Sequence, residues 1–301
     1  MFRNINIKTK IVTIAILGIV LMSVILGSIS VNEAKESLLE KSYQSLTFSR
    51  DNKSQQIKIF FKKAVDDIEV LSQSKDIDQL SYDLKSLYDQ IDVDVTGKFP
   101  IDDGMVKNTI ASSEKFLKNY INKYSYSDIY LIDAEYGHIY YTAKKNLDYG
   151  LTVKYGELKD SSLAKVWQKT LINKSATFVD MSPYIYNNNE PVMFLGMPIF
   201  EDGYEDGEVQ AILVFQIKDN GINNIMKFRE GYKETQEDYL VGKDYLMRSN
   251  SILNPKTFTI VSSFLNPNTY NVKTDAVINA FNGSKKIEII KGYTQKIRLS
   301  A

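Results

Sequence analysis

The 301-residue sequence contains no cysteine, one histidine, His138, and one tryptophan, Trp167. The absence of cysteine excludes disulfide bonds and thiolate chemistry, and it leaves the redox compartment undetermined. With a single histidine, a transition-metal site would have to consist of carboxylates, which are a poor ligand set for zinc. We therefore expect no metal site and no cofactor, and we interpret His138 as a polar residue of a hairpin turn.

An excess of charge of either sign is also missing, because 37 Lys and Arg residues balance 37 Asp and Glu residues. Nucleic-acid binding needs a basic face, so the zero net charge argues against nucleic acid as the main partner. The sequence has no Gly-x-Ser-x-Gly element, phosphate loop or dinucleotide fingerprint. Acidic residues at Asp202, Glu205 and Asp206 lack the spacing of a calcium loop. The sequence therefore predicts a protein that is not an enzyme.

A long apolar run is present near the N-terminus. Ile11–Val31 comprises 21 residues without a charge, enough for a helix to span the roughly 30 Å of a bilayer core. Arg3, Lys8 and Lys10 precede it, so the positive-inside rule places residues 1–10 in the cytoplasm and the bulk of the chain outside the inner (plasma) membrane. The alternative is a cleaved signal peptide, but its apolar core is usually shorter, and Ser28-Ile29-Ser30 is a weak cleavage site.

Residues 32–75 contain neither glycine nor proline, and their apolar residues recur in steps of three and four. This spacing predicts a long stalk helix with one apolar face. Arg50 and Lys53 interrupt the stripe, which argues against a continuous coiled coil. We expect the first half to form the stalk and the seam of a homodimer, and the second half to pack on its own domain. Two further helices are predicted over Asp78–Ile91 and Met105–Lys123.

The central part of the chain predicts an α+β module of the PAS type over residues 76–230. Two strands are followed by a helix, Leu163–Ile172, which Asp160-Ser161-Ser162 can cap, and then by three more strands. The strand-like runs are Asp128–Asp133, His138–Thr142, Ala176–Ser182, Pro191–Phe200 and Glu208–Lys218. In the last run Ala211, Leu213 and Phe215 alternate with polar residues such as Gln216, which predicts a half-buried strand.

The segment Asp180–Asn189 has the composition of the rim of a small-molecule pocket, because it carries a carboxylate, two tyrosines and three asparagines beside an apolar sheet. The alternative is an ordinary surface hairpin loop. If the segment is a rim, the candidate ligand-binding residues are Asp180, Tyr184, Tyr186, Trp167 and Phe194. Strand alternation predicts Asp180 on the face opposite Val179 and Met181, where its carboxylate either meets a ligand ammonium or hydroxyl or caps a backbone turn.

Several stretches resemble the extracytoplasmic double Cache sensor domains of bacterial chemoreceptors, the methyl-accepting chemotaxis proteins. They are Asp128–Asp133, Phe178–Tyr184, Glu190–Phe200 and, most specifically, Tyr239-Leu-Val-Gly-Lys-Asp-Tyr-Leu-Met-Arg-Ser249. The resemblance covers the chain from about Asn32 onward. It implies a membrane-distal PAS-like module that binds small ligands such as amino acids or organic acids, a membrane-proximal module that begins near residue 231, and signalling through helix displacement.

Two departures from that family stand in the sequence. Amino-acid-sensing members share an Arg-x-Trp-Tyr signature, whereas this chain has Lys165-Val-Trp167-Gln168. Lysine cannot bind a carboxylate bidentately as arginine does, so an amino-acid ligand is not implied. The second module, with a hairpin at Tyr239–Ser249, a helix near Thr274–Asn282 and a strand at Lys286–Ile290, is expected to be incomplete over residues 231–301. Alternatives are the ectodomain of a receptor histidine kinase or cyclase, or a structural ectodomain without signalling.

Overall fold

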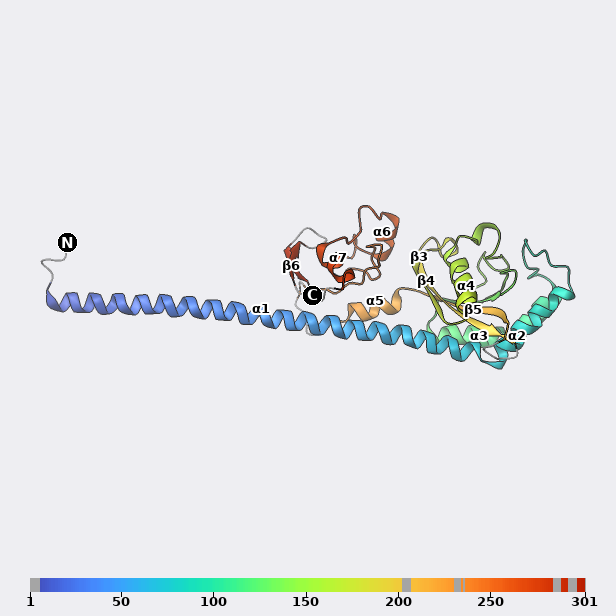
Figure 1. Ribbon diagram of the computed structural model, residues 1–301, viewed down its shortest axis with the longest axis horizontal. Coiled ribbons are helices and arrows are strands. Elements are labelled where there is room, and N and C mark those ends of the chain that lie inside the picture. Colours follow the sequence, from blue (N-terminus) through green and yellow to red (C-terminus); the bar gives the residue numbers. More distant parts are fainter. Residues whose placement is uncertain are drawn as a thin grey trace.

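A computed structural model of the chain describes residues 6–201, 207–229, 234, 236–283, 288–291 and 297–300. Helix α1, Ile7–Ser72, is a single helix of 66 residues that would extend about 99 Å at helical rise. Figure 1 shows it as a rod with the rest of the chain gathered along its C-terminal half. The predicted transmembrane segment and the predicted stalk are therefore one uninterrupted element.

The N-terminal part of α1 contacts no other part of the described chain closely enough to be buried. By length and composition α1 contains one segment that could cross a membrane, and none of that segment is buried. The apolar side chains of Ile11, Leu17 and Val24 are each more than half exposed. In its C-terminal half the helix behaves as the apolar periodicity predicts, because Ala64, Ile68 and Leu71 are buried.

One antiparallel sheet of five strands forms the centre of the fold, in the order β2-β1-β5-β4-β3. Its strands are β1 Asp128–Asp133, β2 Ile139–Thr142, β3 Thr177–Pro183, β4 Pro191–Phe200 and β5 Val209–Ile217. Helix α4, Ser162–Asn173, connects β2 to β3, and the Ser161 side chain accepts a hydrogen bond from the backbone N–H of Ala164. The α+β class and the strand order of two strands, a helix and three strands are confirmed.

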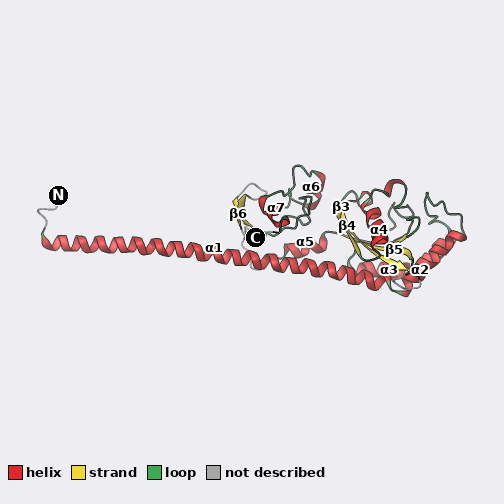
Figure 2. Cartoon of the chain, viewed as in Figure 1, coloured by secondary structure: helices red, strands yellow, loops and turns green. Residues whose placement is uncertain are grey.

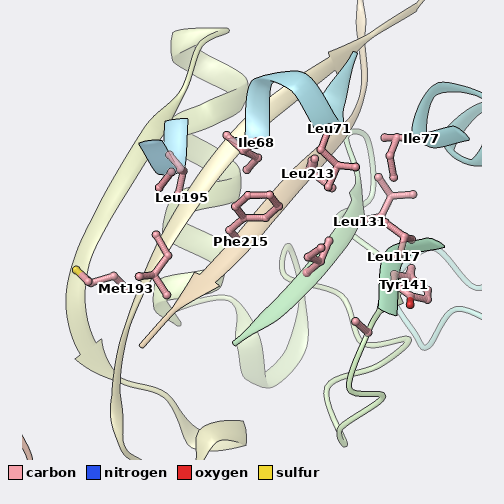
Figure 3. Close-up of a cluster of buried hydrophobic side chains, with 14 of the residues drawn as sticks. Ile68, Leu71, Ile77, Leu117, Leu131, Tyr141, Met193, Leu195, Leu213 and Phe215 are labelled. Atoms are coloured by element: carbon pink, nitrogen blue, oxygen red, sulfur yellow. The ribbon is translucent and has the colours of Figure 1, made fainter. Parts of the chain in front are cut away.

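The first face of the sheet packs against helices that precede it in the chain (Figure 3). Here α1 is joined by α2, Lys75–Ser86, and α3, Gly104–Tyr124, close to the helices predicted from the sequence. We call this the α1-side core. Its labelled members in Figure 3 are Ile68, Leu71, Ile77, Leu117, Leu131, Tyr141, Met193, Leu195, Leu213 and Phe215.

The second face of the sheet packs against α4 and the loops around it, and we call this the α4-side cluster. Its buried members are Tyr130, Ile132, Ile139, Leu151, Val153, Leu158, Leu163, Ala164, Val166, Trp167, Tyr184, Val192, Phe194, Ile212 and Val214. The prediction of a half-buried last strand is therefore wrong. In β5 both Ile212 and Leu213 are fully buried, on opposite faces, and Gln216 is 2% exposed, because helices or loops cover the sheet on both sides.

Beyond the sheet the chain returns along α1. Helix α5, Asn220–Lys227, lies beside the rod (Figure 1), and a Cβ atom on Gly221 would be 2.4 Å from the Phe60 ring. The 3₁₀ turns Leu87–Asp89, Gly156–Leu158 and Ile185–Asn187 complete the helical elements up to this point.

The region from residue 236 onward consists mainly of loops and short elements (Figure 2). It contains α6 Ile260–Leu265, α7 Asp275–Phe281 and the two-stranded antiparallel pair β6 Glu288–Lys291 and β7 Ile297–Ser300. At the predicted hairpin Tyr239–Ser249 the structure has one isolated antiparallel bridge, Val241 to Met247. The predicted helix near Thr274–Asn282 is present, and the Thr274 hydroxyl accepts a hydrogen bond from the Val277 backbone N–H.

Candidate functional site

Four of the five candidate residues lie together in the α4-side cluster. Trp167, Tyr184 and Phe194 are buried members, and Tyr186 packs against them half-buried. The Tyr184 and Phe194 rings meet edge to face with centroids 5.2 Å apart. Phe194 lies on β4, Trp167 on α4 and the two tyrosines in the loop between β3 and β4. The structure thus brings together an aromatic group that the sequence could only suggest.

A fifth aromatic residue and a carboxylate complete this group, and the sequence did not point to them. Tyr130 of β1 is buried with its ring centroid 6.1 Å from that of Phe194. Asp148, from the loop after β2, is fully buried. Its Oδ2 accepts hydrogen bonds from the Tyr184 hydroxyl at 2.8 Å and the Tyr130 hydroxyl at 3.1 Å.

The loop that carries Asp148 is fixed to β2 by backbone hydrogen bonds. The Gly150 N–H donates to the Ile139 carbonyl at 3.2 Å, and the Ile139 N–H donates to the Leu151 carbonyl at 2.8 Å. Gly150 has φ +81° and packs so closely that a Cβ atom would be 3.1 Å from the Phe99 carbonyl oxygen. Glycine is therefore needed here, and the turn that it permits directs the preceding aspartate inward.

One oxygen of this carboxylate has no partner. Among the described residues, nothing donates a hydrogen bond to Asp148 Oδ1, although the atom is buried. Burial raises the pKa of the Asp148 carboxyl, and the hydrogen bonds from Tyr184 and Tyr130 counteract that rise. If the group is ionised, Oδ1 lacks a donor, and if it is protonated on Oδ1, the proton lacks an acceptor. Buried polar atoms are rarely left in this state, and each one calls for an explanation.

The tyrosine hydroxyls extend the polar group to β5 and the covering loop. Tyr130 Oη is 3.0 Å from Gln216 Oε1, and Gln216 Nε2 is 3.4 Å from Asn187 Oδ1. A tyrosine hydroxyl carries one proton, so Tyr130 can donate to Asp148 or to Gln216 but not to both. The Tyr186 hydroxyl donates to Glu157 Oε1 at 2.6 Å. Polar contacts thus hold the loop of Tyr186 and Asn187 over the aromatic group.

Trp167 has a structural anchor of its own. Its indole Nε1 donates a hydrogen bond to the Asp133 backbone carbonyl at 2.8 Å. On the same helix, Lys165 and Gln168 are exposed. The two residues that differ from the amino-acid-sensing signature therefore do not line the α4-side cluster.

Asp180 is not brought together with the other candidates. Its carboxylate accepts hydrogen bonds from Arg248 Nε at 3.1 Å and Nη2 at 2.9 Å, so it links β3 to the region after residue 236. An irregularity in the pairing of β3 with β4 between Val179 and Ser182 places Met181 in the α1-side core. The predicted alternation past Asp180 is therefore wrong, because strand alternation does not hold through a bulge.

Arg248 is held on several sides, and its side chain is 7% exposed. It also donates to Asp244 Oδ2 at 2.9 Å and lies over the Phe264 ring at 5.0 Å. Partial desolvation beside Arg248 acts to raise the pKa of Asp180, but the hydrogen bonds and the positive charge of Arg248 outweigh it and lower that pKa. The Asp180 Oδ1 atom also accepts a hydrogen bond from the backbone N–H of Met181, the next residue.

His138 is fully buried and is not a simple turn residue. Its Nδ1 contacts the Tyr88 hydroxyl, and its Nε2 lies 3.2 Å from the Gly97 carbonyl. Burial lowers the pKa of His138, which favours the neutral ring. The residue fastens the start of β2 to the segment before α3.

In the part of the chain that the structure describes, no group of three or more His, Asp or Glu residues is arranged to hold a metal ion. The acidic turn at Asp202, Glu205 and Asp206 lies outside the described residues.

No protein-family model and no curated protein sequence matches the chain. Solved structures do match. The sensory domain of the Campylobacter jejuni chemoreceptor Tlp3 is similar with a TM-score of 0.52 and 15% identity over 88% of this chain and 90% of that one. The Tlp3 ligand-binding domain in complex with L-valine gives 0.51 and 16% over 88% and 89%, and in complex with L-norvaline 0.53 and 14% over 87% and 86%. The chain therefore has the fold of the double Cache ligand-binding domains of chemoreceptors, as the resemblance implied.

Proposed function

We propose that this chain is the small-molecule-sensing region of a membrane-anchored signal transducer of the chemoreceptor type. Its fold is that of the Tlp3 ligand-binding domain, which binds L-valine and L-norvaline. The exposed apolar segment at the start of α1 supports a membrane anchor over residues 11–31. In this arrangement the five-stranded sheet lies outside the inner membrane, at the far end of α1.

The ligand site proposed here is the α4-side cluster around Asp148. The observation that carries the proposal is the buried Asp148 oxygen that lacks a partner, because a bound ligand would supply the missing hydrogen bond. Tyr184, Tyr186 and Trp167 would surround that ligand. Asp180 serves instead to hold the second region against β3 through Arg248.

Transmission would use β5, because its side chains reach both faces of the sheet. Gln216 belongs to the polar group around Asp148, while the neighbouring Phe215 packs 4.1 Å from the Tyr126 ring, centroid to centroid. The Tyr126 hydroxyl in turn donates to Asp67 Oδ2 on α1 at 2.7 Å. A shift of β5 on ligand binding would thus act on the helix that leads to the membrane.

The remaining parts of the chain fit the same proposal. Residues 231–301 would form the membrane-proximal module, which contacts β3 through Arg248. Two chains would associate along the first half of the stalk, about residues 32–53, where Tyr43 and Phe48 line a shallow groove of about 480 Å³. The dimer would let a displacement of α1 in one chain act on its partner.

Ligand screening of the full-length chain in lipid nanodiscs tests this function. Trp167 is the only tryptophan and is 7% exposed within the proposed site, so its fluorescence reports on that site directly. A ligand at 100 times its dissociation constant should stabilise the chain by about 2.7 kcal/mol and change the Trp167 emission. If no amino acid, amine or organic acid raises the melting temperature, the chain is a structural ectodomain.

A further inference from the structure

The charges around the proposed site are of one sign. Asp148 is buried at its centre, and Glu157 at its rim accepts a hydrogen bond from Tyr186. Among the described residues, the side chains that donate to Asp148 are the two tyrosine hydroxyls, and no lysine, arginine or histidine is an ion-pair or hydrogen-bond partner of this carboxylate. A buried carboxylate without a cationic partner is costly, so a bound cation would relieve this cost.

The side chains around Asp148 suit a cation for a second reason. The rings of Tyr130, Tyr184 and Phe194 lie within one group, with centroids 5.2 Å apart for Tyr184 and Phe194 and 6.1 Å apart for Tyr130 and Phe194. Faces of aromatic rings attract ammonium groups, and the attraction grows when water is excluded. An ammonium can also donate the hydrogen bond that Asp148 Oδ1 lacks.

Two described cations, Lys165 and Arg248, could be considered as partners for a carboxylate on the same ligand, and neither is placed to bind it. Lys165, the one cation of the Lys165-Val-Trp167 segment, is exposed on α4. The negative charge of Asp148 would repel a carboxylate on the ligand. Arg248 is buried and, as an arginine, could bind a carboxylate. It is already paired with Asp180 and Asp244. The site therefore offers recognition for a positive charge but not for a negative one.

We infer that the molecule bound at Asp148 is a cationic amine that carries no carboxylate, held between the carboxylate and the aromatic rings. This inference rests on the proposed sensing function and adds the chemical class of the ligand. It separates this chain from a Tlp3 domain that binds L-valine, although the two share a fold.

Three molecules that share the same branched four-carbon group test the inference on the full-length chain in nanodiscs by calorimetry. Isobutylamine is L-valine without its carboxylate, and isovalerate is L-valine without its amine. We expect isobutylamine to bind and isovalerate not to bind. L-valine should bind at least about 10-fold more weakly than isobutylamine, because its carboxylate would be left without a partner and the loss of one interaction of a charged group costs about this factor. A wider set of amines, amino acids and organic acids is tested in parallel.

The variant Asp148→Asn removes the charge and keeps an oxygen that can accept from Tyr184. It should weaken amine binding by about 10- to 150-fold, the range for a hydrogen bond to a charged group, while circular dichroism confirms the fold. The matched control is Asp102→Asn, which changes a carboxylate whose side chain is 93% exposed and should leave amine affinity unchanged.

The outcomes separate the ligand class from the function. If L-valine binds the wild-type chain as tightly as isobutylamine, or if only amino acids or organic acids bind, the inference is wrong and the sensing function stands. Equal amine affinity in wild type and Asp148→Asn also overturns it. If no compound of any class binds, the sensing function fails, and the inference fails with it.

Discussion

Three carboxylates in this chain, those of Asp148, Asp180 and Asp128, differ in burial and in hydrogen-bond partners. Asp148 is buried, and its Oδ1 has no hydrogen-bond partner among the described residues, whereas Asp180 is engaged by Arg248 and its side chain is 64% exposed. Asp128 is fully buried but fully partnered, since it accepts hydrogen bonds from the Thr142 hydroxyl and from the backbone N–H groups of Ile129 and Lys144. Burial and hydrogen bonding together, more than residue type, decide which of the three is available to a ligand.

The link between Asp180 and Arg248 predicts a loss of stability without a loss of ligand affinity. Asp180→Ala leaves Arg248 with Asp244 as its remaining carboxylate partner. Because Asp180 is largely exposed, we expect a destabilisation of about 1 kcal/mol, the upper end of the range for exposed ion pairs. Chemical denaturation measures it. The control Asp102→Ala, which breaks an exposed ion pair with Lys107, should cost less than about 0.5 kcal/mol. A 10-fold loss of ligand affinity in Asp180→Ala would contradict this prediction and indicate that Asp180 contacts the ligand.

Asp128 predicts a specific dependence of stability on pH. Burial raises the pKa of Asp128 to about 6, so between the unfolded pKa near 4 and the folded pKa near 6 the folded state binds more protons than the unfolded state. Stability from this group therefore falls as pH rises through that window. Asp128→Asn removes the effect. The free energy of unfolding of Asp128→Asn, relative to that of wild type, should rise by up to about 3 kcal/mol between pH 4 and pH 7. A constant difference across this range would contradict the prediction.

At the scale of elements, the contact between α4 and β4 depends on a glycine. A Cβ atom on Gly196 would lie 2.4 Å from Thr170 Oγ1 and 3.0 Å from Val166 Cγ2. The Thr170 hydroxyl, which is buried, has no hydrogen-bond partner among the described residues. The approach of the helix to the sheet is therefore limited by one hydroxyl that contributes no bond of its own.

The variant Gly196→Ala should destabilise the fold by about 1–3 kcal/mol, the usual cost of overpacking a core. Adding Thr170→Ala removes the obstructing hydroxyl, so the double variant should recover about 1 kcal/mol relative to the sum of the two single variants. Urea unfolding of the four proteins measures this coupling. Strict additivity would mean that α4 moves away from β4 at little cost.

Much of the element pattern could be predicted from the sequence because it depends on neighbours in the chain. Strands β1, β4 and β5 differ from their predicted runs by at most one residue at each end, since apolar runs and turn residues mark them. The bulge after Val179 could not be predicted, because it depends on pairing with β4. Asp148 was missed for a similar reason: its partners Tyr130 and Tyr184 lie 18 and 36 positions away, and only the fold brings them together.

For the whole molecule, the sequence pattern predicted the long helix but not the contacts of the last region. The absence of glycine and proline after residue 31 indicates a helix, and α1 runs to Ser72. Arg248 stands in the stretch that resembles chemoreceptors, yet its pairing with Asp180 spans 68 positions. The predicted hairpin at Tyr239–Ser249 has one antiparallel bridge and two backbone hydrogen bonds across it, from Arg248 to Leu240 and from Gly242 to Leu246. The Leu240 N–H donates to the Ser249 hydroxyl, a contact that the strand pattern does not predict.

The proposed orientation of the chain, with its N-terminus in the cytoplasm, leads to a further prediction. Alkaline phosphatase, which is active only outside the cytoplasm, should be active when fused after Lys75, because the basic residues Lys8 and Lys10 keep the N-terminus inside. A fusion after Lys10, before the apolar segment, is the control and should be inactive. Activity of a cytoplasmic reporter at Lys75 would contradict the proposed receptor topology.

The unbroken length of α1 makes it a lever. The helix is held by neighbouring parts of the chain from Ser49 onward, and α5 and the sheet pack on it near Phe60 and Ile68. Its start at Ile7 lies about 60 Å from Ser49 at helical rise. A rotation of about 2° at Ser49 would therefore move the far end through about 2 Å. A rearrangement around the sheet can be too small to alter the packing of the sheet. It would still produce a larger displacement at the N-terminal end of α1, where the apolar segment lies.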